Sequence, residues 1–230
     1  MKITELKIYS PSIGQQQEFY SEVLGLKMLD RSVHMVSFQI GNSILRLEYK
    51  KDATPYHFAI NIPANKDQDA LLWLKSKVEI LKDGTDEIID FKAWNAKAIY
   101  FYDQDKNIVE LIARKNLKNH SDQYFGADQF LEISEIGVAT NDIESEYKTL
   151  REVMDIGVYD GGFGNFCAIG DEYGLFICIN KNRKKWYPTQ DKAYGSDFEV
   201  NVMQEGKSYK VNYRDGAIKV WHSNQGMGTI

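Results

Sequence analysis

The stretch FYDQDKNIVELIARK at 101–115 contains one acidic residue inside an apolar strand pattern. Its first half, DQDKN at 103–107, is a polar turn, and IVELI at 108–112 is typical of a β-strand with Glu110 at its centre. Burying an unpaired charge is costly, so lone acids are uncommon inside apolar strands. Glu110 is therefore either on the solvent-facing side of its strand or held by a cationic group.

His57 is the second polar residue that could take part in chemistry, because it begins the apolar strand pattern HFAINI. A hydrogen-bonded histidine of the core is the simpler interpretation, and metal ligation is the alternative. Cys167 and Cys178 both lie within apolar strand patterns and have no C-x-x-C spacing. We therefore expect buried free thiols rather than a cysteine metal site.

The composition excludes several classes of protein. The chain has 230 residues, 43% of them hydrophobic, and a net charge of −5 without a long run of one sign. This balance argues against a nucleic-acid partner or a membrane surface, and no apolar run is long enough to span a bilayer. The N-terminus lacks the apolar segment of a secretory signal, so a cytoplasmic protein is expected. The basic run NKNRKKW at 180–186 is interpreted as a solvated loop.

Strand and helix patterns alternate in an order that repeats along the chain. A strand at 3–10, a helix at 14–26 and a hairpin at 34–50 around Gly41 and Asn42 form a β-α-β-β-β unit, and a second unit follows at 56–115. After a polar segment at 116–129, EISEIGVATND echoes the first strand and places Glu135 opposite Glu5. SDFEVNV then echoes YHFAINI and places Asp197 where His57 stands in the second unit. The last strand places Lys219 where Glu110 stands.

This repetition predicts an α+β protein of two tandem domains built from four units, the fourth of which is too short for a full helix. The expected boundaries are an N-terminal domain at 1–115, a linker at 116–129 and a degenerate C-terminal domain at 130–230. Each domain is expected to contain two consecutive units.

Three segments in this order resemble the vicinal oxygen chelate superfamily, which includes glyoxalase I, bleomycin resistance proteins and extradiol dioxygenases. They are FYSEVLGLKML, YHFAINI and IYFYDQDKNIVELIAR, the last with Gln104 and Lys106 where the family pattern usually has Pro and Gly. The resemblance covers about 1–115 well and 130–221 more weakly.

The resemblance implies a divalent metal held by the first and last strands of paired units. Carried over onto this chain, the ligand set is Glu5, His57 and Glu110, with Arg46 or Glu48 at the remaining place as a substrate-binding residue. Such a site suits Fe²⁺, Mn²⁺, Ni²⁺ or Zn²⁺. A displaced glutamate, Glu110 or Glu5, would then act as a catalytic proton shuttle. Because Lys219 would repel a cation, no metal is expected in the C-terminal domain.

The implied function is an enzyme acting on a small metabolite with two neighbouring oxygens, by a lyase, isomerase or ring-cleaving reaction. The competing interpretation is a metal-free ligand-binding protein of the bleomycin-resistance type, in which Arg46 bridges Glu5 and Glu110. Ring cleavage is opposed by the presence of one histidine where such sites use two. The expected partner is a small molecule, and the resemblance allows a homodimer.

Overall fold

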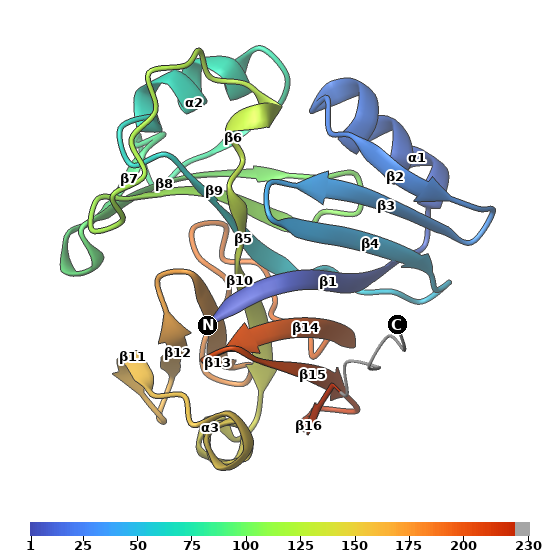
Figure 1. Cartoon of the computed structure of the whole chain (residues 1–230), viewed down its shortest axis with the longest axis vertical. Helices are drawn as coiled ribbons and strands as arrows, with labels where there is room; N and C mark the ends of the chain where they lie inside the picture. Colours follow the sequence, from blue (N-terminus) through green and yellow to red (C-terminus); the bar gives the residue numbers. More distant parts are fainter. Residues whose placement is uncertain (224–230) are drawn as a thin grey trace, which may run out of the picture.

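The computed structural model describes residues 1–223 and shows the four units in order along the chain (Figure 1). The first unit comprises β1 (Lys2–Ser10), α1 (Ile13–Glu18), the π-helical turn η1 (Phe19–Val23), β2 (Met28–Arg31), β3 (Met35–Ile40) and β4 (Ser43–Tyr49). The second comprises β5 (His57–Ile62), α2 (Asp67–Lys75), β6 (Ile80–Leu81), β7 (Ile89–Phe91), the 3₁₀ turn η2 (Lys92–Trp94), β8 (Ala96–Tyr102) and β9 (Ile108–Arg114).

The second half of the chain repeats this order and then shortens it. A 3₁₀ turn, η3 (Ala127–Gln129), precedes the third unit, which comprises β10 (Glu132–Thr140), α3 (Ile143–Met154), β11 (Val158–Gly162), β12 (Phe166–Asp171) and β13 (Gly174–Asn180). The fourth unit has β14 (Phe198–Gln204), β15 (Lys207–Arg214) and β16 (Ala217–His222), with no helix in the described part that follows β14. The predicted α+β class and the abbreviated fourth unit are confirmed.

The strands form two sheets that do not join consecutive units. A seven-stranded sheet has the order β16-β15-β14-β1-β4-β3-β2, and a nine-stranded sheet has the order β11-β12-β13-β10-β5-β9-β8-β6, with β7 paired to β8. Unit one therefore shares a sheet with unit four, through β1 and β14, and unit two shares a sheet with unit three, through β5 and β10.

The expectation that each domain contains two consecutive units is therefore wrong, while the boundaries near residues 115 and 130 stay predictions. The two helices α1 and α2 lie on the side of the molecule opposite α3 in Figure 1. Both junctions between units are antiparallel pairs, so either partner would satisfy the backbone hydrogen bonds of these strands. Local sequence patterns specify each unit and leave open which unit it joins.

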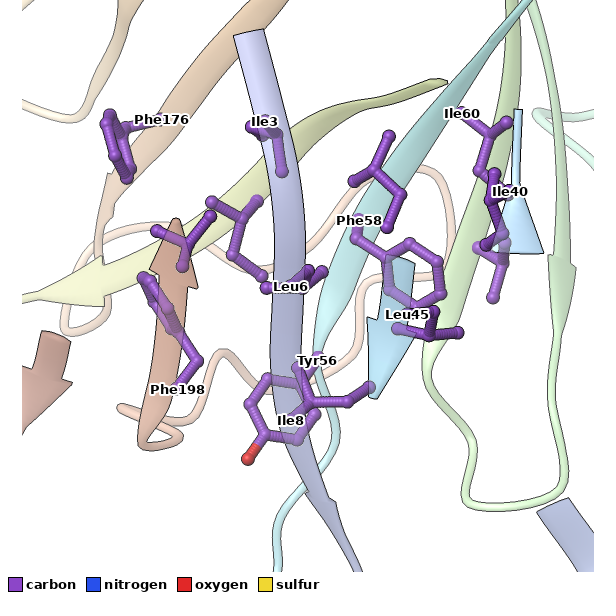
Figure 2. Close-up of a cluster of buried hydrophobic side chains, with 14 of the residues drawn as sticks. Ile3, Leu6, Ile8, Ile40, Leu45, Tyr56, Phe58, Ile60, Phe176 and Phe198 are labelled. Carbon is purple, nitrogen blue, oxygen red and sulfur yellow. The ribbon is translucent and has the colours of Figure 1, made fainter. Parts of the chain in front are cut away.

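The main core forms on one face of both sheets, where alternating residues of each strand are buried together with the helices. On β5, Phe58 and Ile60 enter this core, whereas His57 and Ala59 point to the opposite face. Figure 2 shows part of the core, with Leu6 of β1, Phe58 of β5 and Phe198 of β14 close together. The alternation of apolar and polar residues read from the sequence thus separates a shared core from a second, more polar face.

A close backbone contact joins the first hairpin to the third unit. Gly41 has a φ of 51°, and a Cβ at this position would lie 1.9 Å from the carbonyl oxygen of Leu131. The next residue, Asn42, donates its backbone N–H to that same oxygen at 2.7 Å. The hairpin turn is therefore both a local turn and a contact between the two sheets.

We predict that Gly41→Ala lowers the free energy of unfolding much more than Gly84→Ala. Gly84 also has a positive φ, of 58°, but a Cβ there meets nothing within 4 Å. The control should show only the left-handed backbone penalty of about 1–2 kcal/mol, and Gly41→Ala should exceed it by about 2 kcal/mol or more through the clash. Denaturation in urea measures both values, and equal losses would contradict the proposed role of the Leu131 contact.

Candidate metal centre

The face of the nine-stranded sheet opposite the main core encloses a cavity with a volume of about 810 Å³. Strands β5, β9, β10 and β13 form its base, and the segments 90–94 and 183–190 form its walls. Three buried residues that can ligate a metal, His57, Glu110 and Glu135, lie together at this base.

These three side chains come from three adjacent strands. His57 begins β5, Glu110 lies at the centre of β9 opposite Ala59, and Glu135 lies on β10 opposite the same Ala59. Nε2 of His57 is 3.6 Å from Oε2 of Glu110 and 3.9 Å from Oε2 of Glu135. The sheet therefore holds two carboxyl groups on either side of one imidazole.

The state of His57 favours ligation. Its Nδ1 lies 3.2 Å from the carbonyl oxygen of Ile108, so Nδ1–H donates there and Nε2 presents its lone pair to the carboxyl groups. Burial lowers the pKa of His57 to about 4, against the opposing effect of the bond to Ile108. The imidazole is neutral at pH 7, and its contacts with the two glutamates are therefore not ion pairs.

In the part of the chain that the structure describes, only one of the two carboxyl groups has a cationic partner. Arg114, at the end of β9, is fully buried and donates from Nη2 to Oε1 of Glu135 and from Nε to Asn61 Oδ1 at 3.2 Å. Burial and then the neighbouring Glu135 raise the pKa of Glu110 well above its ordinary value, and Arg114 and Tyr100 act in the opposite direction. Burial also raises the pKa of Glu135, while Arg114 lowers it.

The donor set fits a divalent cation. Arg114 offsets one negative charge, and its Nη1 atom is buried without a hydrogen-bond partner in residues 1–223 instead of reaching Glu110. Ligand atoms at about 2.0–2.2 Å from one tetrahedral ion lie roughly 3.3–3.6 Å apart, close to the separations found here. One imidazole and two carboxylates also make an anionic, mainly oxygen-donating site of the kind that Mn²⁺, Fe²⁺ and Zn²⁺ accept.

The long connection between β13 and β14 covers this base. The Trp186 ring lies 5.1 Å from the His57 ring, centroid to centroid, and Tyr187 and Gln190 also line the cavity. A Cβ on Gly137 would lie 2.6 Å from the Trp186 ring, so glycine at this position gives the indole room to pack there. The segment interpreted from sequence as a solvated basic loop leads directly into this cover.

Glu5, Arg46 and Glu48 lie elsewhere, on the other sheet, so their predicted grouping with His57 and Glu110 is wrong. Arg46 Nε donates to Glu5 Oε1 at 2.7 Å, and Glu48 pairs with Lys7 at 3.3 Å. They line a separate cavity of about 170 Å³. The physical reason is the pairing of units, since β1 bonds to β14 and not to β5. Arg46 does not bridge to Glu110, and a metal-binding role for Glu5 or a substrate-binding role for Arg46 and Glu48 has no support from this placement.

The strand registers show how the two sheets correspond. In the nine-stranded sheet, Glu135 of β10 is paired with Ala59 of β5, which is paired in turn with Glu110 of β9. In the seven-stranded sheet, Glu5 of β1 is paired with Asn201 of β14, which is paired in turn with Lys210 of β15. Lys210 therefore takes the place of Glu110 in the seven-stranded sheet. The same registers place Glu199 at the position of His57.

The sequence alignment of the fourth unit was therefore inaccurate. It assigned Asp197 and Lys219 to these two places, but Asp197 pairs with Lys50 and Lys219 lies on β16, opposite Asn212. Lys7 and Lys210 both pair with Glu199. Ion pairs within the chain thus fill the polar face of the seven-stranded sheet, where the nine-stranded sheet has a buried site with uncompensated carboxyl charge.

Comparison with known proteins supports the fold at very low sequence identity. No family model matches the sequence, and no curated protein matches it either. A candidate dioxygenase from Bacillus subtilis superposes with a TM-score of 0.64 at 12% identity, over 98% of this chain and 86% of that one. A point mutant of glyoxalase I from Zea mays superposes with a TM-score of 0.58 at 14% identity, over 97% of this chain and 92% of that one.

The chain has the two-domain glyoxalase fold. The resemblance to the vicinal oxygen chelate superfamily that three sequence segments predicted is confirmed at the level of this fold. Among the described helices, none combines the length and apolar character needed to cross a membrane.

Glu135 is the site residue that the sequence interpretation missed. The repeat identifies Glu135 as the counterpart of Glu5. The same repeat places Lys219 near Glu135, and a lysine there argues against a bound cation. The distribution of cations was the available signal: Arg46, Lys7 and Lys210 all fall in units one and four. Pairing unit two with unit three is the arrangement that separates His57, Glu110 and Glu135 from these cations.

We predict that Arg114→Met costs about 3–5 kcal/mol of unfolding free energy at neutral pH, because it leaves the buried Glu135 without its partner. The matched control is Arg46→Met, which breaks an ion pair whose side chains are 31% and 26% exposed and should cost about 0–1 kcal/mol. Urea denaturation in the presence of a chelator measures both. The excess cost should shrink at acid pH as Glu135 takes up a proton, and equal costs at neutral pH would contradict the assignment.

Proposed function

We propose that the protein is a divalent-metal-dependent enzyme that acts on a small metabolite carrying two neighbouring oxygen atoms. The observation that carries this proposal is the group of His57, Glu110 and Glu135, whose ligand atoms all lie within 4.8 Å of one another at the base of a large cavity. Within residues 1–223, only one of its two carboxyl groups is offset by a cation. A ligand shell of three protein groups leaves positions open for a substrate.

The place that a fourth protein ligand would take is apolar, which fits substrate binding. Gly137 is paired with Ile177 on β13, as Lys7 is paired with Arg46 in the other sheet, and Ile177 lines the cavity. An isoleucine cannot complete a coordination shell. It gives the base one apolar side against which the carbon skeleton of a small molecule can pack.

A bound divalent ion would supply Lewis-acid stabilisation of negative charge that develops on a substrate oxygen. The protein's own groups divide the remaining work. Glu110 is suited to accept or return a proton, because burial and the neighbouring Glu135 raise its pKa well above its ordinary value. Arg114 favours the charged form of Glu135 by pairing with it, against the effect of burial on the pKa of Glu135. His57 is fixed in one tautomer by Ile108, and Trp186 restricts the access of water.

The reaction class we favour is proton transfer of the lyase or isomerase type. A protonatable carboxyl group beside the open positions is what such a reaction requires. Ring cleavage is the runner-up, and it is weakened by the presence of a single imidazole, since non-haem iron oxygenases use two histidines and one carboxylate.

Metal titration provides the first test. The purified protein should bind one equivalent of Mn²⁺, Zn²⁺ or Ni²⁺, measured by calorimetry and by elemental analysis after gel filtration. Loss of a side chain that only hydrogen-bonds to a metal ligand costs about 10–100-fold in metal affinity. The substitutions His57→Ala, Glu110→Gln and Glu135→Gln remove ligands themselves, so each should cost at least that much.

The matched control for this titration is Glu5→Gln. Glu5 corresponds to Glu135 in the seven-stranded sheet but is paired with Arg46. Its substitution should leave metal affinity within about twofold. Equal loss in Glu5→Gln and Glu135→Gln, or the absence of stoichiometric metal in the unsubstituted protein, would contradict the proposed site.

Activity separates the two reaction classes. We expect the metal-loaded protein to catalyse exchange of the α-proton of small hydroxyketones with solvent deuterium, followed by NMR. Glu110→Gln should lower the exchange rate by about 100-fold or more, since general acid–base catalysis contributes about 10²–10⁴-fold. Oxygen uptake with a catechol by the Fe²⁺-loaded protein, without proton exchange, would favour ring cleavage instead.

A metal-free binding protein remains a second candidate because of one observation, the buried ion pair between Arg114 and Glu135. In that case a proton on Glu110, rather than a metal, would remove the second buried charge. The pair predicted from sequence for this role, Arg46 with Glu5, is in the other sheet. Absence of stoichiometric metal in the unsubstituted protein, together with small-molecule binding that a chelator leaves unchanged, would favour this second candidate.

A further inference from the structure

Charges around the cavity are separated by depth. The two acids at its base, Glu110 and Glu135, are buried, whereas four cationic residues that line it are exposed: Lys92, Arg183, Lys184 and Lys185. Exposed side chains that line a cavity lie at its opening, so these cations form the rim. In a chain with a net charge of −5, four cations at one opening are a local reversal of the overall sign.

The positive charges of the rim cations are not neutralised by ion pairs in the part of the chain that the structure describes. In residues 1–223 none of the four forms an ion pair. Lys184 lies over the Phe166 ring, 4.7 Å from its centroid. Two acids, Asp90 and Asp160, also lie at the opening. Asp160 accepts hydrogen bonds from Trp94 Nε1 at 2.6 Å and from the Gly161 backbone at 2.7 Å. The exposed part of the cavity therefore carries a net positive charge.

The walls between rim and base are aromatic. Trp94 and Phe166 lie 6.3 Å apart with an angle of 31° between their rings, and both line the cavity. Tyr100 and Trp186 line it beside His57, at ring distances of 6.3 Å and 5.1 Å from the imidazole. Flat apolar walls of this kind favour a planar molecule, because rings stack on them in offset or tilted arrangements.

We infer that the substrate is an acid with a planar conjugated body, which carries at its other end the two neighbouring oxygens and the carbon that exchanges its proton. Its anionic group would lie among Arg183, Lys184 and Lys185 at the rim, its flat body between the aromatic walls, and its two neighbouring oxygens at the His57 group. The position of the oxygens rests on the proposed function, whereas the preference for an anion rests on the rim alone. The preference for an anion should weaken as salt concentration rises, because exposed charges are screened.

Two pairs of probe molecules test the binding of the anionic group at the rim and the binding of the two oxygens at the His57 group separately. The pair 2-naphthoate and 2-naphthamide differs in charge and lacks neighbouring oxygens, so it tests the rim without the metal. The pair 3,4-dihydroxybenzoate and 3,4-dihydroxybenzamide adds the two oxygens. Binding of each probe is followed by tryptophan fluorescence, since Trp94 and Trp186 line the cavity, with Zn²⁺-loaded and with chelator-treated protein.

We expect each acid to bind about tenfold or more tightly than its amide, with or without Zn²⁺. In the triple variant Arg183→Gln, Lys184→Gln, Lys185→Gln, the ratio of affinities for acid and amide should fall by about tenfold, because three exposed charges that each contribute modestly are removed. The variant should bind the amides as before. The control is Lys51→Gln, Lys118→Gln, Lys207→Gln, which makes the same change in net charge at exposed positions that do not line the cavity. It should keep the preference.

The outcomes for this inference and for the proposed function are distinct. Equal affinity for acids and amides, loss of the preference in the control as large as in the rim variant, or no binding of either acid would overturn the inference. Dihydroxy probes that gain nothing from Zn²⁺, while 2-naphthoate still binds more tightly than 2-naphthamide, would support the anionic rim and count against the metal-dependent function.

Discussion

Two carboxyl groups buried at one point of a sheet are the constraint on which the rest of this structure depends. Glu110 and Glu135 share the base of the cavity, and one buried guanidinium group, that of Arg114, pairs with only one of them. In a medium of low dielectric constant, like charges at this separation repel strongly and each pays a desolvation cost. The arrangement is stable only if a cation or a proton removes the second charge.

The seven-stranded sheet shows how the same architecture behaves without that constraint. Its β1 pairs with β14 and β4 as β10 pairs with β5 and β13. Here, however, Arg46 pairs with Glu5, and Lys7 and Lys210 pair with Glu199. These side chains are partly exposed, so their ion pairs contribute little and cost little. In the seven-stranded sheet these charged side chains form ion pairs with one another. In the nine-stranded sheet, one carboxyl group buried at the base of the cavity has no cationic partner in residues 1–223. This asymmetry explains why, of the two similar sheets, the nine-stranded sheet carries the group of metal-ligating side chains found in residues 1–223.

The sequence predicts the units well and their partners poorly. Hydrophobic alternation around Phe58 and Glu110 places one residue in the core and the other on the polar face, and Gly25 and Gly41 mark the helix end and the hairpin turn. These features depend on residues close together in the chain. The junctions of β1 with β14 and of β5 with β10 depend on contacts far apart in sequence, and any two first strands of this pattern can form them. That single ambiguity exchanged Glu135 for Glu5 in the predicted site.

The sign of charge was the information that could have resolved this ambiguity. A ligand set for a cation cannot share its cavity with Arg46 and Lys210 without being neutralised by them. Assigning those cations and the His57 group to different sheets removes the conflict, and only the pairing of unit two with unit three does so. The same reasoning gives meaning to the basic run at 183–185, which is separated from the buried acids by a layer of aromatic side chains. Exposed cations at the rim, above a base where one buried carboxyl group has no cationic partner in residues 1–223, would let a cavity attract an anion and still bind a metal.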